Sequence, residues 1–168
     1  MAVYFFDSSA LVKRYSLEDG RRWVQAITDP DPAVASPIYI ARIAGAETIA
    51  AFMKKVRDRK ILEVDAARFI SDFRIDFDNQ YQIIEITDAV VARAMTLIES
   101  YKLRGYDGVQ LAASLEVNDL ISSTGMSAIG VSALTLVSAD DDLNRAAVAE
   151  GLIVEDPRAH LHPDDKTP

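Results

Sequence analysis

Two aspartates stand where chains of alternating strands and helices often carry their chemistry. Asp7 directly follows the apolar stretch VYFF at residues 3–6, and Asp140 stands two residues beyond the apolar stretch LTLVS at residues 134–138. Both stretches have the length and composition of buried strands. In an open parallel sheet, binding sites form outside the carboxyl ends of the strands. The two carboxylates are therefore expected to face one crevice if their strands are neighbours.

A third carboxylate, Glu47, lies within a long apolar pattern of helical period. It shares a helical face with Ile43 and Ala51, so the pattern places it on the buried stripe. Burial of an unpaired carboxylate is costly. Glu47 is therefore expected to pair with an arginine such as Arg42 or Arg104, to bind a metal ion, or to lie at the edge of a groove.

A fourth carboxylate, Asp107, stands in LRGYDGVQLAAS at the beginning of another helical pattern. An aspartate there ordinarily caps the helix by accepting a backbone hydrogen bond, and the same simple role suits Asp7 and Asp140 at their strand-to-helix turns. Ser9 and Ser138, each two residues from one of these aspartates, suit turns or caps equally well. The arrangement of the four acids nevertheless favours a shared functional site, because two lie at strand ends, one opens a helix and one points into the core.

Clustered carboxylates repel one another, and a divalent metal ion relieves that repulsion. Oxygen-only ligands select hard cations such as Mg²⁺, with Mn²⁺ as a substitute. Such an ion lowers the pKa of a bound water and stabilises charge on a phosphoryl oxygen, which predicts phosphodiester or phosphomonoester hydrolysis. Cysteine is absent, so thiolate and Cys-ligated metal chemistry is excluded, and the two histidines, His160 and His162, lie in the C-terminal stretch.

The elements that must position these side chains alternate between strand and helix. Strands are expected at residues 3–6, 33–36, 81–86, 134–138 and 152–155. Helices are expected over about twenty residues from Ser36 as N-cap and Pro37 as first helical residue, and then at 64–79, 87–102, 106–117 and 141–151. The alternation predicts an α/β fold with a central, mostly parallel sheet of four to five strands flanked by helices. A Gly/Ser-rich loop is expected at 121–133, and a poorly ordered tail at 155–168 after a single domain spanning 1–154.

Composition limits the class of protein further. A length of 168 residues with 49% hydrophobic content suits one well-buried domain. No apolar run approaches the ~18 residues of a membrane-spanning helix, so we expect a soluble cytoplasmic protein without a membrane partner. The chain carries 18 basic and 26 acidic residues and a net charge of −8, which opposes a broad electrostatic grip on nucleic acid.

The order of these motifs resembles a known family. DSSALVKRY near the start, a lone Glu47 in an apolar helix, LRGYDGVQLAAS and LVSADDDLNRAAVAEGL are similar to the motifs of the PIN domain, in particular of VapC-type toxins from toxin–antitoxin pairs. The resemblance implies a single PIN-like domain with Mg²⁺-dependent endoribonuclease activity on an RNA substrate. It also implies a homodimer that a small antitoxin protein silences. The family's acidic pocket and its supporting hydroxyls correspond here to Asp7, Glu47, Asp107 and Asp140, and to Ser9 and Ser138.

Within that resemblance, Asp7, Asp107 and Asp140 are expected to bind the metal, with Glu47 bound directly or through water. Asp142 is the alternative to Asp140, because residues 140–142 are three aspartates in a row. Gly105 and Gly108 flank Asp107 where alanine is more usual in the family, and they are expected to fray that helix start. Because the net charge is acidic, RNA contacts are expected from a few cations only, namely Lys13, Arg14, Arg42 and Arg104.

Two rival interpretations start from the same residues. A haloacid-dehalogenase-like Mg²⁺ phosphatase also places an aspartate nucleophile after its first strand, but it needs a second acid two residues later, where this chain has Ser9. The other rival is a PIN-like fold without catalysis that serves as a binding module. Cleavage of RNA or of a small phosphomonoester separates these alternatives.

Overall fold

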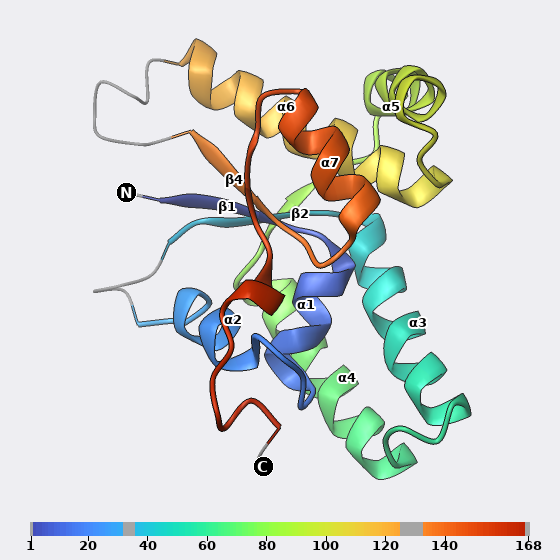
Figure 1. Cartoon of the computed structure of the whole chain (residues 1–168), viewed down its shortest axis with the longest axis vertical. Helices are drawn as coiled ribbons and strands as arrows, with labels where there is room; N and C mark the ends of the chain where they lie inside the picture. The colour runs from blue at the N-terminus through green and yellow to red at the C-terminus, as the bar shows by residue number, and fades with distance from the viewer. Residues whose placement is uncertain (1, 32–35, 125–132, 167–168) are drawn as a thin grey trace.

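The computed structural model describes residues 2–31, 36–124 and 133–166. Its centre is a five-stranded sheet whose strands are all parallel and lie in the order β3-β2-β1-β4-β5 (Figure 1). The strands are β1 (Val3–Phe6), β2 (Ile38–Ala41), β3 (Gln82–Ile84), β4 (Leu134–Val137) and β5 (Ile153–Glu155). The prediction of an α/β fold with a central parallel sheet is thus confirmed.

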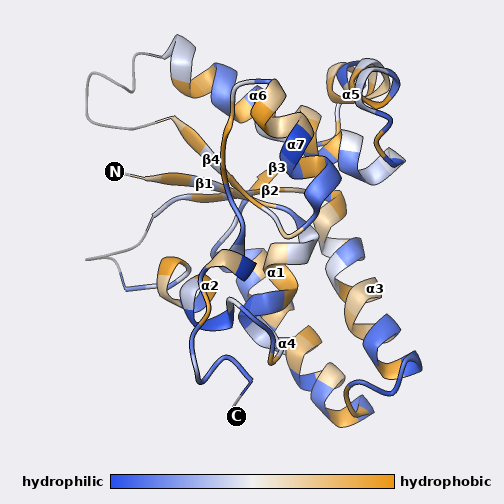
Figure 2. Ribbon diagram, viewed as in Figure 1, coloured by the Kyte–Doolittle hydropathy of each residue, from blue (hydrophilic) through white to orange (hydrophobic). Residues whose placement is uncertain are grey.

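Helices cover both faces of the sheet, and each layer encloses its own apolar core. The first group is α1 (Ser8–Tyr15), α2 (Arg21–Ile27), α3 (Ile43–Arg57) and α4 (Glu63–Asn79). The second group is α5 (Asp88–Tyr101), α6 (Gly105–Ser123) and α7 (Asp141–Ala149). Phe52, Phe69 and Phe73 fill the core under the first group, whereas Leu111, Leu115 and Leu143 belong to the core under the second. Figure 2 shows the strands as largely hydrophobic between helices of mixed character. In the described ranges, no helix has both the length and the apolarity needed to cross a membrane.

The second strand is where the sequence prediction failed. The prediction placed a strand at 33–36 and began the following helix at Pro37, but β2 occupies Ile38–Ala41 and α3 begins only at Ile43. Residues 33–35 lie outside the described residues. The segment IYIA is β-branched and aromatic, as strands prefer, and it pairs with β1 on one side and β3 on the other. Only Arg42 separates β2 from α3, so the apolar pattern of the strand runs into that of the helix. The boundary between them therefore cannot be recognised from the sequence.

The start of α6 depends on a glycine for a reason other than the predicted fraying. A Cβ atom on Gly108 would lie 2.4 Å from Cγ1 of Ile98, so the glycine allows α5 and α6 to approach closely. The helix also runs further than predicted, to Ser123. Most of the predicted loop, residues 125–132, lies outside the described residues.

The segment after β5 packs against α2, which differs from the predicted poor order. The Asp165 side chain is buried and accepts hydrogen bonds of 2.9 Å from the backbone N–H groups of Gly20, Arg22 and His162. Gly20 has a φ of +84°. The bonds from Gly20 and Arg22 satisfy free amides at the beginning of α2. They also hold the C-terminal segment, which is described as far as residue 166, against the rest of the domain.

Candidate functional site: an acidic edge of the sheet

Asp7 is fixed at the carboxyl end of β1 by short hydrogen bonds. Its Oδ1 accepts from the Ser9 hydroxyl at 2.8 Å and from the Ala10 backbone N–H at 3.1 Å. The Ser9 oxygen in turn accepts from the Ala139 N–H at 2.8 Å. The expected capping role of Asp7 is therefore present, and Ser9 also ties this carboxylate to the chain that follows β4.

The two aspartates predicted to share one edge are brought together because β1 and β4 are neighbours. Phe6 pairs with Val137, and the Asp7 N–H donates to the Val137 carbonyl at 3.2 Å. Ser138 lies close to both acids, since its hydroxyl accepts from the Asp140 N–H at 3.0 Å and acts to lower the pKa of Asp7. Both serines predicted as supporting residues thus lie within one hydrogen-bonded network.

Asp140 is the N-cap of α7. Its Oδ1 accepts from the backbone N–H groups of Asp142 and Leu143, both at 3.0 Å, which leaves Oδ2 outside the cap. Asp142, the alternative to Asp140, is exposed and forms an ion pair with Arg145. The hydrogen bond to Ser138 therefore favours Asp140 as the fourth member of the site.

Glu47 is half-buried on α3, and its partner is an amide rather than the arginine that the sequence suggested. The Gln110 Nε2 donates to Glu47 Oε2 at 2.6 Å. Arg42, one of the two expected partners, instead forms an exposed bidentate pair with Glu85. Gln110 was not anticipated from the sequence, although a polar residue inside the apolar run VQLAA is a visible signal.

Asp107 lies in the first turn of α6 rather than at its N-cap, which is Arg104. Its carboxyl accepts a hydrogen bond from the Arg104 backbone. Burial and then the charge of Asp140 raise the pKa of Asp107, while the Arg104 charge acts in the opposite direction. Asp107 therefore lies within electrostatic reach of the network at β1 and β4.

Burial is also the largest influence on the pKa values of Asp7 and Glu47. Burial raises the pKa of Asp7 to about 7, against the hydrogen bonds from Ser9, Ala10 and Ser138. Burial also raises the pKa of Glu47, the Gln110 hydrogen bond lowers it, and the charge of Asp107 raises it again. Within the described part of the chain, none of the four carboxylates forms an ion pair with a lysine or arginine. We call this set of like charges, Asp7, Glu47, Asp107 and Asp140, the acidic edge.

The acidic edge has the donor chemistry of a site for a hard divalent cation, because all of its candidate ligands are carboxylate oxygens. The raised pKa values show that full ionisation of these acids is unfavourable without added positive charge. Among residues 2–31, 36–124 and 133–166, no three acidic or histidine side chains already stand where they could hold a metal ion together. Side-chain rotation would therefore have to accompany metal binding.

The four cations predicted to contact RNA divide into two pairs. Arg42 and Arg104 are exposed, and Arg104 lies close enough to influence Asp107. Lys13 is buried, and its Nζ lies 3.3 Å from Glu18 Oε2 and 3.0 Å from the Asp19 carbonyl oxygen. Lys13 is thus turned into the protein, so the structure does not support an RNA contact by this residue.

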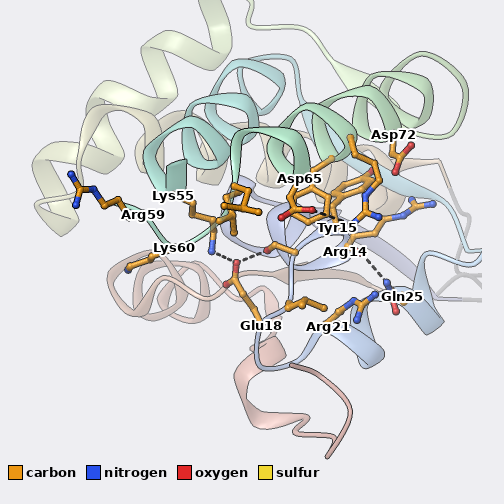
Figure 3. Close-up of a pocket in the computed structure, with 16 residues that line it drawn as sticks. Arg14, Tyr15, Glu18, Arg21, Gln25, Lys55, Arg59, Lys60, Asp65 and Asp72 are labelled. Carbon is orange, nitrogen blue, oxygen red and sulfur yellow. Dashed lines mark hydrogen bonds and ion pairs between the residues drawn. The ribbon is translucent and has the colours of Figure 1, made fainter. Parts of the chain in front are cut away.

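Arg14 has a structural environment as well. Its guanidinium lies 3.2 Å from Asp76 and donates to the Tyr81 hydroxyl at 2.9 Å. Arg14 also lines a cavity of about 910 Å³ beside α1, α2 and α4, shown in Figure 3. We call this the basic cavity after its six cationic lining residues, which are Arg14, Arg21, Lys55, Arg59, Lys60 and Arg68. None of the four acidic-edge carboxylates lines it.

The parallel sheet and its two helix layers recur in proteins of known structure. A protein from Pyrobaculum aerophilum, PAE2754, superposes with a TM-score of 0.56 at 18% identity, covering 91% of this chain and 89% of its own. The toxin–antitoxin complex from Klebsiella pneumoniae contains a chain with a TM-score of 0.54 at 20% identity, covering 92% and 97%. At these identities the likeness concerns the fold.

Sequence comparison places the chain more narrowly. It is 33% identical over 119 residues to ribonucleases VapC45 and VapC49 from two strains of Mycobacterium tuberculosis, covering 71% of this chain and 79% of theirs. No family model matches the sequence. The chain belongs to the VapC family of PIN-domain proteins.

Proposed function

We propose that this protein is a metal-dependent endoribonuclease that hydrolyses phosphodiester bonds in RNA and acts as the toxin of a toxin–antitoxin pair. The proposal is supported by relatives named as ribonucleases and by a fold shared with a toxin–antitoxin complex. The observation that carries it is the hydrogen-bonded network of Asp7, Ser9, Ser138 and Asp140 at the carboxyl edge of β1 and β4. This network brings Asp7 and Asp140 together, within electrostatic reach of Glu47 and Asp107.

Asp7, Asp107 and Asp140 would hold Mg²⁺, or Mn²⁺ in its place, with Glu47 bound directly or through water. When bound, the ion lowers the pKa of a water molecule and neutralises charge on the scissile phosphate. The protein's contribution is orientation, because the Ser9 hydroxyl and the Ala10 backbone N–H both donate to Oδ1 of Asp7. Such preorganisation reduces the reorganisation needed when a substrate arrives.

RNA binding must work against the net charge of −8. Arg104 is exposed at the start of α6 and its charge acts on Asp107, so it is the cation best placed to contact the phosphates that flank a cleavage site. Arg42 is exposed too, but it would have to leave its ion pair with Glu85 to contact RNA. A grip that depends on few cations is weak and sensitive to salt. We therefore expect cleavage to slow as the salt concentration rises.

The proposed partners are an antitoxin and a second copy of the chain. A solved structure that shares this fold is described as a toxin–antitoxin complex. A small antitoxin protein is accordingly expected to silence cleavage, and the active form is expected to be a cytoplasmic homodimer. Size-exclusion chromatography with light scattering tests the dimer, and repeating it with the product of any small reading frame found beside the gene tests the antitoxin.

The first experiment is cleavage of a mixed pool of structured RNAs by the purified protein with Mg²⁺, with Mn²⁺ and with EDTA. Asp7→Asn serves as the matched inactive variant, because its amide oxygen can still accept the hydrogen bonds from Ser9 and Ala10. Metal-dependent fragments that disappear in the variant support the proposal. Turnover of a small phosphomonoester without RNA cleavage would support a phosphatase instead, and silence on both substrates would favour a binding module.

A further inference from the structure

Gln110 is a polar side chain that the proposed mechanism does not yet use. It is 1% exposed and lies on α6, one helical turn after Asp107. Its Nε2 donates to Glu47 Oε2 at 2.6 Å, which joins α6 to α3 at the acidic edge. The two helices belong to opposite layers of the fold (Figure 1). Gln110 is thus a direct side-chain link between layers at the point where the acids gather.

The chemistry of the pair fixes which end of the amide faces Glu47. An ionised carboxylate can only accept hydrogen bonds, so the NH₂ group of Gln110 must face it. The other end, Oε1, is buried and has no hydrogen-bond partner within the described residues. A leucine at this position would fill similar space without burying an unpaired oxygen, so simple packing does not explain the glutamine.

Glu47 needs such a partner because its surroundings oppose an ordered, ionised carboxylate. It is partly buried, it lies in the field of Asp107, and no cation among the described residues pairs with it. A neutral donor can hold the carboxylate in place without neutralising it. An arginine at the same place would satisfy Glu47 fully and would compete with a metal ion for its charge.

We propose that Gln110 is a positioning residue that holds the Glu47 carboxylate towards Asp107, so that Glu47 can take part in binding a divalent metal ion at the acidic edge. The inference rests on the proposed metal-dependent function. It adds a residue to the site that acts through Glu47 and that touches neither RNA nor the reacting atoms. Partners of this kind affect metal affinity or activity by about 10–100-fold when they are removed.

The test is a set of Mn²⁺ titrations by calorimetry on the wild type, Gln110→Leu, Gln110→Asn and Glu47→Gln. Leucine lacks the donor, and asparagine keeps the amide but is one methylene too short to reach Glu47. Both variants are expected to bind Mn²⁺ about 10–100-fold more weakly than the wild type, with a little-changed thermal midpoint. In the Glu47→Gln background, Gln110→Leu is expected to add no further loss, because its effect passes through Glu47.

Ser114→Ala is the matched control. Ser114 is fully buried on the same helix, one turn further along, and its hydroxyl donates to the Leu111 carbonyl of that helix at 2.8 Å, its one hydrogen bond among the described residues. This variant is expected to leave Mn²⁺ affinity unchanged. An equal loss of affinity in Ser114→Ala would mean that the effect reflects helix packing, and would overturn the inference.

Failure of the inference can be told apart from failure of the proposed function. If Gln110→Leu binds Mn²⁺ and cleaves RNA as the wild type does, the positioning role is wrong and the nuclease proposal stands. If the wild type binds Mn²⁺ but cleaves no RNA, the nuclease proposal fails while the titrations still decide the role of Gln110. A wild type that binds no Mn²⁺ overturns the inference outright.

Discussion

At the acidic edge carboxylates face carboxylates, whereas at the basic cavity cations face acids. In the cavity, Lys55 pairs with Glu18 (Figure 3). Arg14 pairs with Asp76, which lies beyond the lining. Arg68 lies over the Phe69 ring at 5.4 Å and 3.9 Å from Asp65. At the acidic edge, by contrast, the neighbours of Asp7 are hydroxyls, an amide and another acid.

The charges of the basic cavity are largely neutralised within the protein, whereas those of the acidic edge are left for a bound cation to neutralise. Where a cation already has an acid partner, its removal should cost stability and little else. Where buried acids repel one another, the free protein is less stable than it would be with neutral groups there. A cation that binds there relieves the repulsion and so stabilises the folded state. Enclosed volume alone would have pointed to the basic cavity, whereas uncompensated charge points to the acidic edge.

The largest expected effect is on RNA cleavage. Asp7→Asn at the acidic edge should lose it, whereas Arg14→Met at the basic cavity should keep it. The aspartate variant is expected to cleave RNA at about one-hundredth of the wild-type rate or less, because the proposed metal ligand is lost while the fold is kept. The arginine variant should retain wild-type cleavage per folded molecule. Rates measured on the same RNA at equal folded concentration check both, and a severe loss in Arg14→Met would move the functional site towards the cavity.

The same Asp7→Asn variant is expected to be more stable than the wild type in EDTA. The pKa of Asp7 is raised from 3.8 to about 7 in the folded state, so between these pH values the unfolded chain loses a proton that the folded chain keeps. Wild-type stability therefore falls as the pH rises from about 4 to 7, by up to about 4 kcal/mol for a shift of this size.

Urea unfolding of both proteins from pH 4 to pH 8 measures this difference. The gap between the variant and the wild type should open with rising pH and close again when Mn²⁺ is added to the wild type. A constant gap at every pH would mean that Asp7 is not destabilised by its charge.

At the basic cavity, Arg14→Met is expected to lower the free energy of unfolding by about 2 kcal/mol. The guanidinium is largely buried between Asp76 and Tyr81, and its removal leaves both partners without a charged donor. Chemical unfolding at pH 7 measures the loss. Arg68→Gln is the control, because Arg68 is well exposed and its ion pair is long, so it should change stability by less than about 0.5 kcal/mol.

Gly108→Ala tests whether the acidic edge depends on the close approach of α5 and α6. The new Cβ would meet Ile98 at 2.4 Å, so we expect a loss of about 1–3 kcal/mol together with slower cleavage, because Asp107 precedes the displaced residue. Gly105→Ala is the control, since no atom lies within 4 Å of its Cβ position. It should leave stability equal or slightly higher, because alanine favours the helix more than glycine does. An equal loss in both variants would mean that the contact with Ile98 is not the cause.

Much of the site was predictable because the residues that position Asp7 and Asp140 lie close to them in the sequence. The apolar strands before Asp7 and Asp140, and the serines two residues away, place these acids at one edge once β1 and β4 are neighbours. Glu47 stood out because a carboxylate is rare on an apolar helical face. The PIN fold itself followed from the order of these motifs.

The remainder depended on contacts that sequence spacing does not report. The partner of Glu47 is Gln110 on α6, 63 residues away in the sequence. The sequence around Glu47 does not show whether its partner is this glutamine or an arginine from another element. Lys13 looked like a surface cation because it stands beside Arg14 in a basic stretch, yet it is buried against Glu18. Burial and pairing of charges are decided by tertiary packing, and only the structure shows them.

The smallest expected effect concerns Arg104, the exposed cation beside Asp107. If it contacts one RNA phosphate, Arg104→Gln should raise the KM for RNA a few-fold and reduce the slope of log affinity against log salt by about 1. Its stability should stay within about 0.5 kcal/mol of the wild type, because an exposed charge contributes little to folding.

Arg68→Gln at the basic cavity provides the matched comparison, with no change in either KM or salt slope. Binding of a non-cleaved RNA to the Asp7→Asn protein at several salt concentrations measures both slopes. If Arg68→Gln changes the slope and Arg104→Gln does not, RNA contacts the basic cavity and the division of roles between the two regions is wrong.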